Sequence, residues 1–354
     1  MRHRAVLILG HLLVPLLGFL CLEGSAGARV IALFPIQNPA GDSEAASTVD
    51  QTLRFELSNH GSLVGPERTR NALRRLRIRS GDHAAPTLLR LLGEELEADW
   101  VVSASLHDTE RRTVPRLAMS LRIYSSATGE LTWTGFQAGS GLDRRKILGL
   151  GTIDEMDSLI PFVVRDLLAE LALTEERGEA ASSPAHRGSR ASLGKVAVVT
   201  FSGSTRFRPT LNGETVTEAV RAQLFRSGVD VVSPNLAFDV LRQQQSGRWD
   251  GVTARTWTAL RSDAGADTIL TGEVEIYELG GSEFAPRPRV VIAMRLLDAA
   301  TGRILWTGSL ERTGWDSQSL LGFGRIHSRG ALTERIVSIL TKRLEKEYPG
   351  NDSG

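Results

Sequence analysis

Residues 127–135 read ATGELTWTG and residues 300–308 read ATGRILWTG, so one pattern of nine residues occurs twice, 173 positions apart. Three further matches follow the same order along the chain: residues 29–34 with 195–201, 98–102 with 266–270, and 148–151 with 321–324. Collinear matches of this kind indicate an internal repeat, in which each copy is one structural unit. Gly129 and Trp133 match Gly302 and Trp306, and we interpret all four as structural positions of the repeat.

Each copy alternates strand and helix patterns. An apolar run opens the copy at 30–34 and 196–201, as expected for a strand buried on both faces. Val216, Val220 and Leu224 then recur at helical spacing. The remaining patterns predict strands at 229–232 and 268–276, helices at 86–97, 237–244 and 253–264, a hairpin around each Ala-Thr-Gly turn, and closing helices at 155–172 and 330–345. The predicted fold class is α/β, with two tandem α/β sandwich domains, each a mixed sheet with flanking helices.

These patterns divide the chain into a leader and two domains. The first domain is predicted at 29–173 and the second at 194–348. Residues 174–193 contain almost no apolar side chain to bury and are predicted to be a flexible linker.

The first 28 residues have the features of a signal peptide. Arg2 and Arg4 precede an apolar run, and Ala26-Gly27-Ala28 supplies small residues for cleavage after Ala28. Pro15 interrupts the run, which is shorter than a membrane span requires. We therefore expect a periplasmic protein with no transmembrane span in the mature chain, although retention by an uncleaved leader stays open.

Cys21 is the single cysteine and lies inside this leader. Leu20 precedes it where lipoprotein signals carry a small residue, so lipid anchoring at Cys21 is the less favoured alternative. Without residues 1–28 the chain has 40 basic and 40 acidic residues and a net charge of zero, which gives no long-range attraction to nucleic acid. The arginine-rich stretch 68–79 lacks interleaved aromatic residues and is predicted to be a solvated helix face.

The motifs of both copies resemble a bacterial envelope superfamily that includes the TolB N-terminal domain, the LpoB-type activators of penicillin-binding proteins and the CsgG-type curli secretion components. The resemblance rests on the strand Val196 to Phe201, on Gly265-Ala-Asp267, and on the hairpin 297–306, LDAATGRILW. It implies a non-enzymatic periplasmic adaptor or accessory protein that binds a cell-envelope partner. A curli-type pore is not expected, because the chain lacks a convincing lipidation cysteine and a long alternating hairpin between the shared elements. The sequence leaves the partner and the oligomeric state open.

Enzymatic motifs are weak. Gly149-Leu-Gly151 and Gly322-Phe-Gly324 lack the rest of a phosphate-binding loop and are interpreted as tight turns before the last helix of each copy. His83, His107, His186 and His327 share no metal-ligand spacing, so we expect surface histidines and no metal or cofactor. The paired Glu94 and Glu95 are interpreted as a solvated helix face, and Trp133 and Trp306 as packing residues.

The polar loops after the opening strands are the candidate binding loops. Their candidate residues are Gln37, Asn38, Ser202, Ser204 and Arg206. The strand ends of a doubly wound sheet offer a ligand crevice, so the alternative function is a periplasmic small-molecule or glycan-binding protein. The two loops differ in chemistry, which favours the adaptor, since a partner surface need not repeat.

Overall fold

The computed structural model describes residues 29–79, 81, 84–145, 150–176, 193–203, 209–244, 253–316, 318 and 324–348. The expected signal peptide with Cys21, residues 177–192 of the expected linker, and the candidate residues Ser204 and Arg206 lie outside the described residues. Within the described part of the chain, no helix combines the length and the apolar character that crossing a membrane requires.

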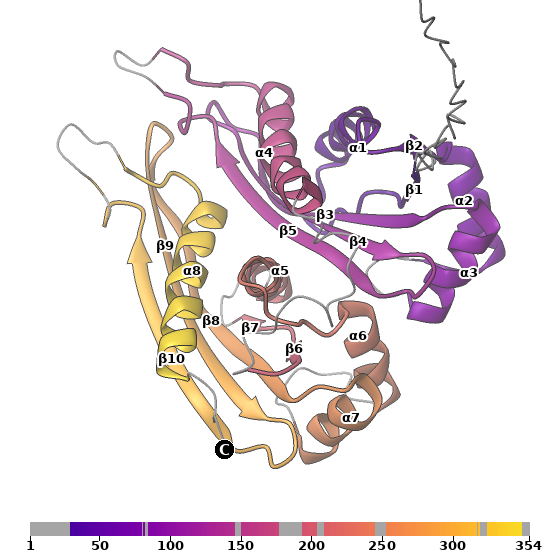
Figure 1. Ribbon diagram of the computed structural model, residues 1–354. Helices are drawn as coiled ribbons and strands as arrows, with labels where there is room; N and C mark the ends of the chain where they lie inside the picture. Colours follow the sequence, from indigo (N-terminus) through magenta and orange to yellow (C-terminus); the bar gives the residue numbers. More distant parts are fainter. Residues whose placement is uncertain are drawn as a thin grey trace, which may run out of the picture.

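The first half is one mixed sheet with four helices (Figure 1). Its strand order is β2-β1-β3-β4-β5, with β1 parallel to β2 and β3 and the other neighbours antiparallel. Its elements are β1 (Val30–Leu33), α1 (Ser43–Leu57), β2 (Ser62–Leu63), α2 (Pro66–Arg75), α3 (Pro86–Leu96), β3 (Trp100–Glu110), β4 (Arg116–Ser125), β5 (Leu131–Ser140) and α4 (Met156–Glu176).

The second half repeats this connectivity. Its sheet has the order β10-β9-β8-β6, with β6 parallel to β8, and β7 also pairs with β8. Its elements are β6 (Val196–Val198), β7 (Ser202–Gly203), α5 (Pro209–Arg226), α6 (Pro234–Gln243), α7 (Ala254–Ala264), β8 (Thr268–Ser282), β9 (Ala285–Asp298), β10 (Ile304–Thr313) and α8 (Arg329–Glu347). The predicted fold class of tandem α/β domains with mixed sheets is therefore confirmed.

One predicted strand is much reduced. The strand expected at 229–232 is only a parallel bridge between Val231 and Val196, at the place that β2 has in the first half. Pro234 starts α6 three residues later, and its ring fixes the first turn of a helix, so little chain is left for a strand. The strand predicted at 268–276 continues to Ser282.

The matching glycines and tryptophans have matching environments. Gly129 and Gly302 have φ angles of 74° and 69°, a conformation that glycine adopts at little cost. A Cβ atom on Gly129 would also lie 2.4 Å from the carbonyl oxygen of Pro86. Trp133 and Trp306 are 3% and 7% exposed, and each lies in the core of its own half. Gly151 and Gly324 have φ angles of 80° and 83° shortly before α4 and α8, as expected for tight turns.

The two halves stack as alternating layers of helices and sheets (Figure 1). We call the face of each sheet that packs on its own long helices the inner face, and the opposite face the outer face. The inner face of the first sheet packs on α1 and α4, and that of the second sheet on α5 and α8. Helices α5 and α8 also contact the outer face of the first sheet, because Ala118, Phe136 and Ala138 belong to the second half's core.

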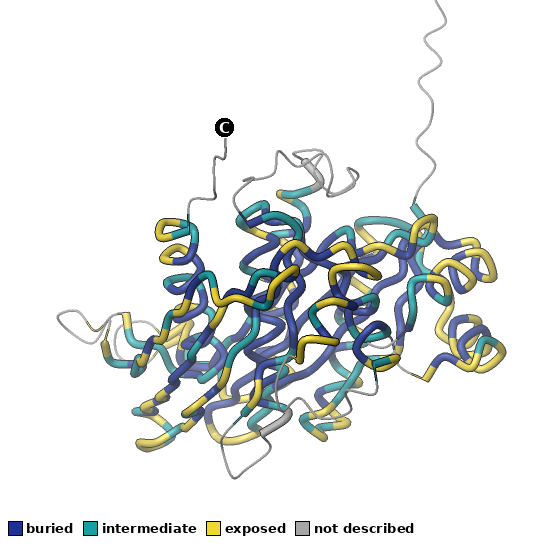
Figure 2. The backbone as a smooth tube through the Cα atoms, turned by 90° about the horizontal axis from the view of Figure 1, so that it is seen from below, coloured by how far each residue is buried: buried dark blue, intermediate teal, exposed yellow. Residues whose placement is uncertain are grey.

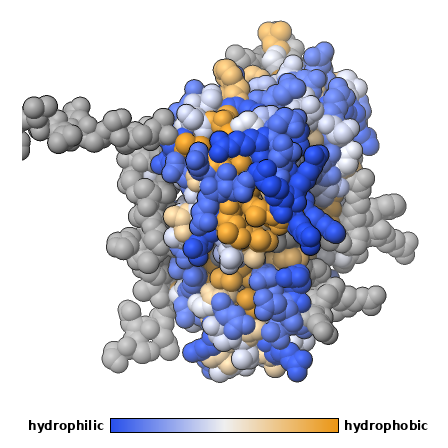
Figure 3. Space-filling view, turned by 90° about the vertical axis from the view of Figure 1, so that its right-hand side faces the viewer, coloured by the Kyte–Doolittle hydropathy of each residue, from blue (hydrophilic) through white to orange (hydrophobic). Residues whose placement is uncertain are grey.

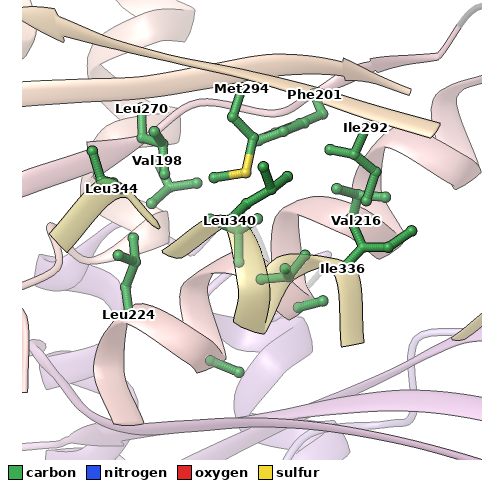
Figure 4. Close-up of a cluster of buried hydrophobic side chains, with 14 of the residues drawn as sticks. Val198, Phe201, Val216, Leu224, Leu270, Ile292, Met294, Ile336, Leu340 and Leu344 are labelled. Atoms are coloured by element: carbon green, nitrogen blue, oxygen red, sulfur yellow. The ribbon is translucent and has the colours of Figure 1, made fainter. Parts of the chain in front are cut away.

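Burial follows this layer order. The tube in Figure 2 is buried through the strands and exposed at many turns. Figure 4 shows the second core, where Leu340 and Ile336 of α8 and Val216 of α5 lie opposite Met294 and Ile292 of β9. The helix pair α5 and α8 therefore joins the two halves through apolar contacts on both of its sides.

The remaining helices lie at one end of the sheets. Helices α2 and α3 pack with Val101 and Tyr124 of the first sheet, and α6 and α7 pack with Ile269 and Leu297 of the second. Figure 3 shows this side of the molecule, where an apolar strip is bordered by hydrophilic residues. The arginines of α2 are exposed, which confirms the prediction of a solvated helix face.

Candidate functional site

A cavity of about 460 Å³ lies where the two halves meet. The first half contributes Gln37, Asn38, Pro39, Ser105, His107 and Arg122. The second half contributes Val198, Val199, Thr200, Glu214, Thr217, Glu218, Arg221, Pro234, Ala237, Phe238 and Leu241. Its volume falls within the range of small-molecule pockets, which makes it the candidate functional site.

The cavity contains the chain that follows the opening strand of each half. Gln37 follows β1 and pairs with β3, because its backbone N–H donates to Ala104 and its carbonyl oxygen accepts from Leu106, both at 2.9 Å. The side-chain oxygen of Asn38 accepts from the backbone N–H groups of Gly41 and Asp42. Asn38 thus fixes the turn that leads into α1, and it also lines the cavity. In the second half, Val198 at the end of β6 and the next two residues, Val199 and Thr200, line the cavity.

The predicted loop residues divide into two groups. Gln37 and Asn38 line the cavity, together with residues of the second half. Ser202 does not line it, because Ser202 lies on β7 and pairs with Glu273 of β8. The cavity therefore joins the predicted loop of the first half to residues 198–200 of the second half, which precede the predicted loop there.

A buried charge network joins the halves beside the cavity. Glu218 on α5 accepts from Nε of Arg122 on β4 at 2.8 Å, and a second guanidinium nitrogen of Arg122 lies 2.8 Å from the other carboxylate oxygen. Arg221, one turn after Glu218, also donates to Glu218 and donates to the carbonyl oxygen of Val198 at 3.0 Å. Burial alone would raise the pKa of Glu218, but Arg122 and Arg221 outweigh it and lower the pKa to about 2.

His107 is the residue that sequence reasoning misplaced. We expected a surface histidine, but His107 is 3% exposed. Its ring nitrogen Nε2 lies 2.8 Å from Oγ of Ser120, and it occupies a β-bulge between Leu106 and Asp108. The prediction was wrong because α5 of the second half packs on this face of β3. The repeat in the sequence does not show which of the two sheets has helices of the other half packed on it.

The network was not predicted from the sequence either. Arg122 lies 96 residues from Glu218 along the chain, and the three residues match no motif. The sequence of α5 does carry one signal. Its central turns have no single apolar face, because charged and apolar residues alternate around the helix, and the structure buries all of residues 215–222. A helix buried all round must lie between two layers.

This geometry provides fixed donors and acceptors beside an apolar wall. Ser120 is 1% exposed and does not line the cavity, so its contact with His107 offers no substrate access to the hydroxyl group. Among the described residues, no group of three His, Cys, Asp or Glu side chains is arranged to hold a metal ion. The arrangement suits binding through hydrogen bonds and apolar contact.

Comparisons with known proteins give distant similarities only. No protein-family model matches the chain, and no curated protein matches it. Solved structures with a similar fold include the PelC dodecamer from Paraburkholderia phytofirmans, with 21% identity over 46% of this chain and 89% of that one, and a TM-score of 0.29. Lipoprotein GNA1162 from Neisseria meningitidis has 19% identity over 43% of this chain and 99% of that one, with a TM-score of 0.30. The LpoB C-terminal domain from Escherichia coli has 18% identity over 34% and 82%, with a TM-score of 0.25. Similarity at this level carries no functional conclusion.

Proposed function

We propose that this chain is a non-enzymatic periplasmic adaptor or accessory protein that binds another protein of the cell envelope, such as a component of outer-membrane assembly, secretion or peptidoglycan synthesis. The motif resemblance described above suggests this class. The structural observation that supports partner binding is the outer face of the second sheet, which is formed by β8, β9 and β10.

That face is open where its counterpart is filled. On the first sheet, α5 and α8 pack on the outer face. On the second sheet, Glu273, Arg295, Thr307 and Ser309 of the outer face are exposed, and no described element packs on them. The same type of sheet face therefore occurs twice in the fold. Helices of the chain cover it on the first sheet and leave these residues exposed on the second. A charged, open sheet face suits a polar and exchangeable protein interface.

Affinity capture from envelope extracts tests this proposal. The bait is the chain without its leader, and the test variant exchanges two charges on the open face, Arg295→Glu with Glu273→Lys. The matched control exchanges two exposed charges on α3, Arg90→Glu with Glu94→Lys, so both variants keep the net charge. We expect the parent and the control to retain the same envelope protein and the test variant to lose it. Equal retention by all three would show that the open face is not the binding surface, and turnover of a substrate without any protein partner would overturn the adaptor.

Small-molecule or glycan binding is the second candidate function. The observation that favours it is the cavity itself, since the chain after the opening strands of both halves lines one space. Thermal unfolding in the presence of candidate ligands measures it, because a ligand that binds only the folded state raises the unfolding temperature.

A further inference from the structure

We infer that the cavity between the halves takes a small organic anion, with a single carboxylate group carried on a compact apolar body. This inference rests on the second candidate function, and it names the class of ligand. It comes from three features of the cavity: one unused donor, the charge of the buried groups, and the separation of polar and apolar walls.

The unused donor is Nε of Arg221. The other two nitrogens of this guanidinium donate to Glu218 and to the carbonyl oxygen of Val198. Nε is buried, and no acceptor lies within hydrogen-bond distance of it among the described residues. Buried donors normally have partners, and Arg221 is 8% exposed and lines the cavity. Nε has almost no accessible surface, so an oxygen atom of a ligand would complete its hydrogen bonding once the guanidinium group turns towards the cavity.

The buried charges next to this donor do not balance. Arg122 and Arg221 carry two positive charges and Glu218 carries one negative charge, and each of the three residues is less than a tenth exposed. Glu214 also lines the cavity but is partly exposed, so solvent screens its charge more strongly. One ligand carboxylate would balance the buried excess and accept from Arg221.

The apolar lining residues select the rest of the ligand. Helix α6 contributes Pro234, Ala237, Phe238 and Leu241, and Val199 extends this apolar surface. A ligand that places its carboxylate at Arg221 therefore has an apolar wall to cover its remaining atoms. Among the described lining residues there is no second pair of cationic side chains for a highly charged ligand such as a nucleotide. Arg221 and the apolar residues belong to the second half, and Arg122 belongs to the first, so a ligand carboxylate beside both arginines would lie between the halves.

Calorimetric titration with benzoate and hexanoate tests the inference, with benzamide and hexanamide as the uncharged comparison ligands. We expect each carboxylate to bind at least about ten times more tightly than the amide of the same shape. Arg221→Lys keeps the charge but removes Nε, and it should weaken the carboxylates about tenfold while leaving the amides unchanged. The matched control is Arg54→Lys, because Arg54 follows the buried Leu53 on α1 as Arg221 follows Val220 on α5, and it should bind both carboxylates like the parent.

Phe238→Ala leaves the charge network intact and tests the apolar wall even where Arg221→Lys folds poorly. We expect it to weaken benzoate several-fold. If the amides bind as tightly as the acids, the ligand class is wrong while the cavity remains a binding site. If no probe binds to the parent, both the inference and the small-molecule role fail. Partner capture by the open sheet face is measured separately, so neither result decides the adaptor proposal.

Discussion

The outer faces of the two sheets occupy the same place in the repeat but have opposite environments. On the first sheet, Ser105, Arg122, Phe136 and Ala138 are buried under α5 and α8. At the matching places of the second sheet, Glu273, Arg295, Ser309 and Glu311 are exposed. The order of the matching strands is the same in both sheets, so strand order does not decide whether the face is covered. Part of the difference lies in the side chains, because Phe136 and Ala138 offer an apolar surface to the helix pair where Ser309 and Glu311 are polar.

Arginine provides the sharpest test, because both sheets carry it at one place. Arg122 pairs with Glu218 in the buried network, whereas Arg295 is exposed. We expect Arg122→Ala to lower the free energy of unfolding by about 3–5 kcal/mol, because it removes one partner from a buried ion pair. Arg295→Ala should change it by no more than about 0.5 kcal/mol. Denaturant unfolding of both variants measures the difference, and equal losses would contradict the assignment of a filled and an open face.

This pair also shows what the sequence could predict. The repeat, the strand and helix order and the buried tryptophans follow from local patterns, because hydrophobic period and turn residues act within a few positions. The contrast between Arg122 and Arg295 does not follow, since both are arginines in matching strands. Their environments are decided by contacts with α5, which lies about a hundred residues from Arg122 along the chain. The cavity was missed in the same way, apart from Gln37 and Asn38, because its walls belong to different halves.

Gly330 tests how closely α8 approaches the filled face. A Cβ atom at this position would lie 2.6 Å from the Cβ atom of Ala138 and 2.9 Å from that of Ala118. In an exposed helix, replacing glycine by alanine stabilises by about 0.5–1 kcal/mol. We expect Gly330→Ala to destabilise instead, by about 1–3 kcal/mol, because α8 must move away from the first sheet. Ser158→Ala, at an exposed position in the first turns of α4, is the control and should be nearly neutral in the same unfolding measurement. A gain in stability for Gly330→Ala would mean that α8 does not press on the sheet.

Glu334 gives the filled face a pH dependence. It lies on α8, accepts a backbone hydrogen bond from Ala138 on the first sheet, and has Glu170, Asp143 and Arg226 around it. Burial, with Glu170 and Asp143, raises its pKa from 4.5 to about 8, against the opposing effect of Arg226. Because the folded pKa is the higher one, the stability linked to this proton is fully present below the unfolded pKa of 4.5 and is lost as the pH rises through about 8.

The full linkage value of this shift is roughly 5 kcal/mol, but Glu334 is partly exposed and solvent screens its charge. We therefore expect Glu334→Gln to be more stable than the parent by about 2 kcal/mol near pH ~9 and nearly equal to it near pH ~4. Denaturant unfolding at both pH values measures this. Glu94→Gln on α3 is the matched control in the same measurement, because Glu94 is exposed. A difference for Glu334→Gln that is the same at both pH values would show that folding does not raise the pKa of Glu334.

Ser309 is the position at which the open face can be tested with the smallest expected change in stability. It matches the buried Phe136, and Ser309→Phe gives the second sheet the residue that the first sheet buries under the second half's helices. Because Ser309 is exposed, the added ring meets only neighbours within the sheet, such as Ala293 opposite it, and the free energy of unfolding should change by no more than about 0.5 kcal/mol. The reverse exchange, Phe136→Ser, should be strongly destabilising, since it opens a cavity and places a hydroxyl group in the core. Unfolding curves recorded at several protein concentrations distinguish the alternatives. If a second molecule covers this face in solution, Ser309→Phe will clash with it, and its effect on stability will grow with protein concentration instead of remaining small.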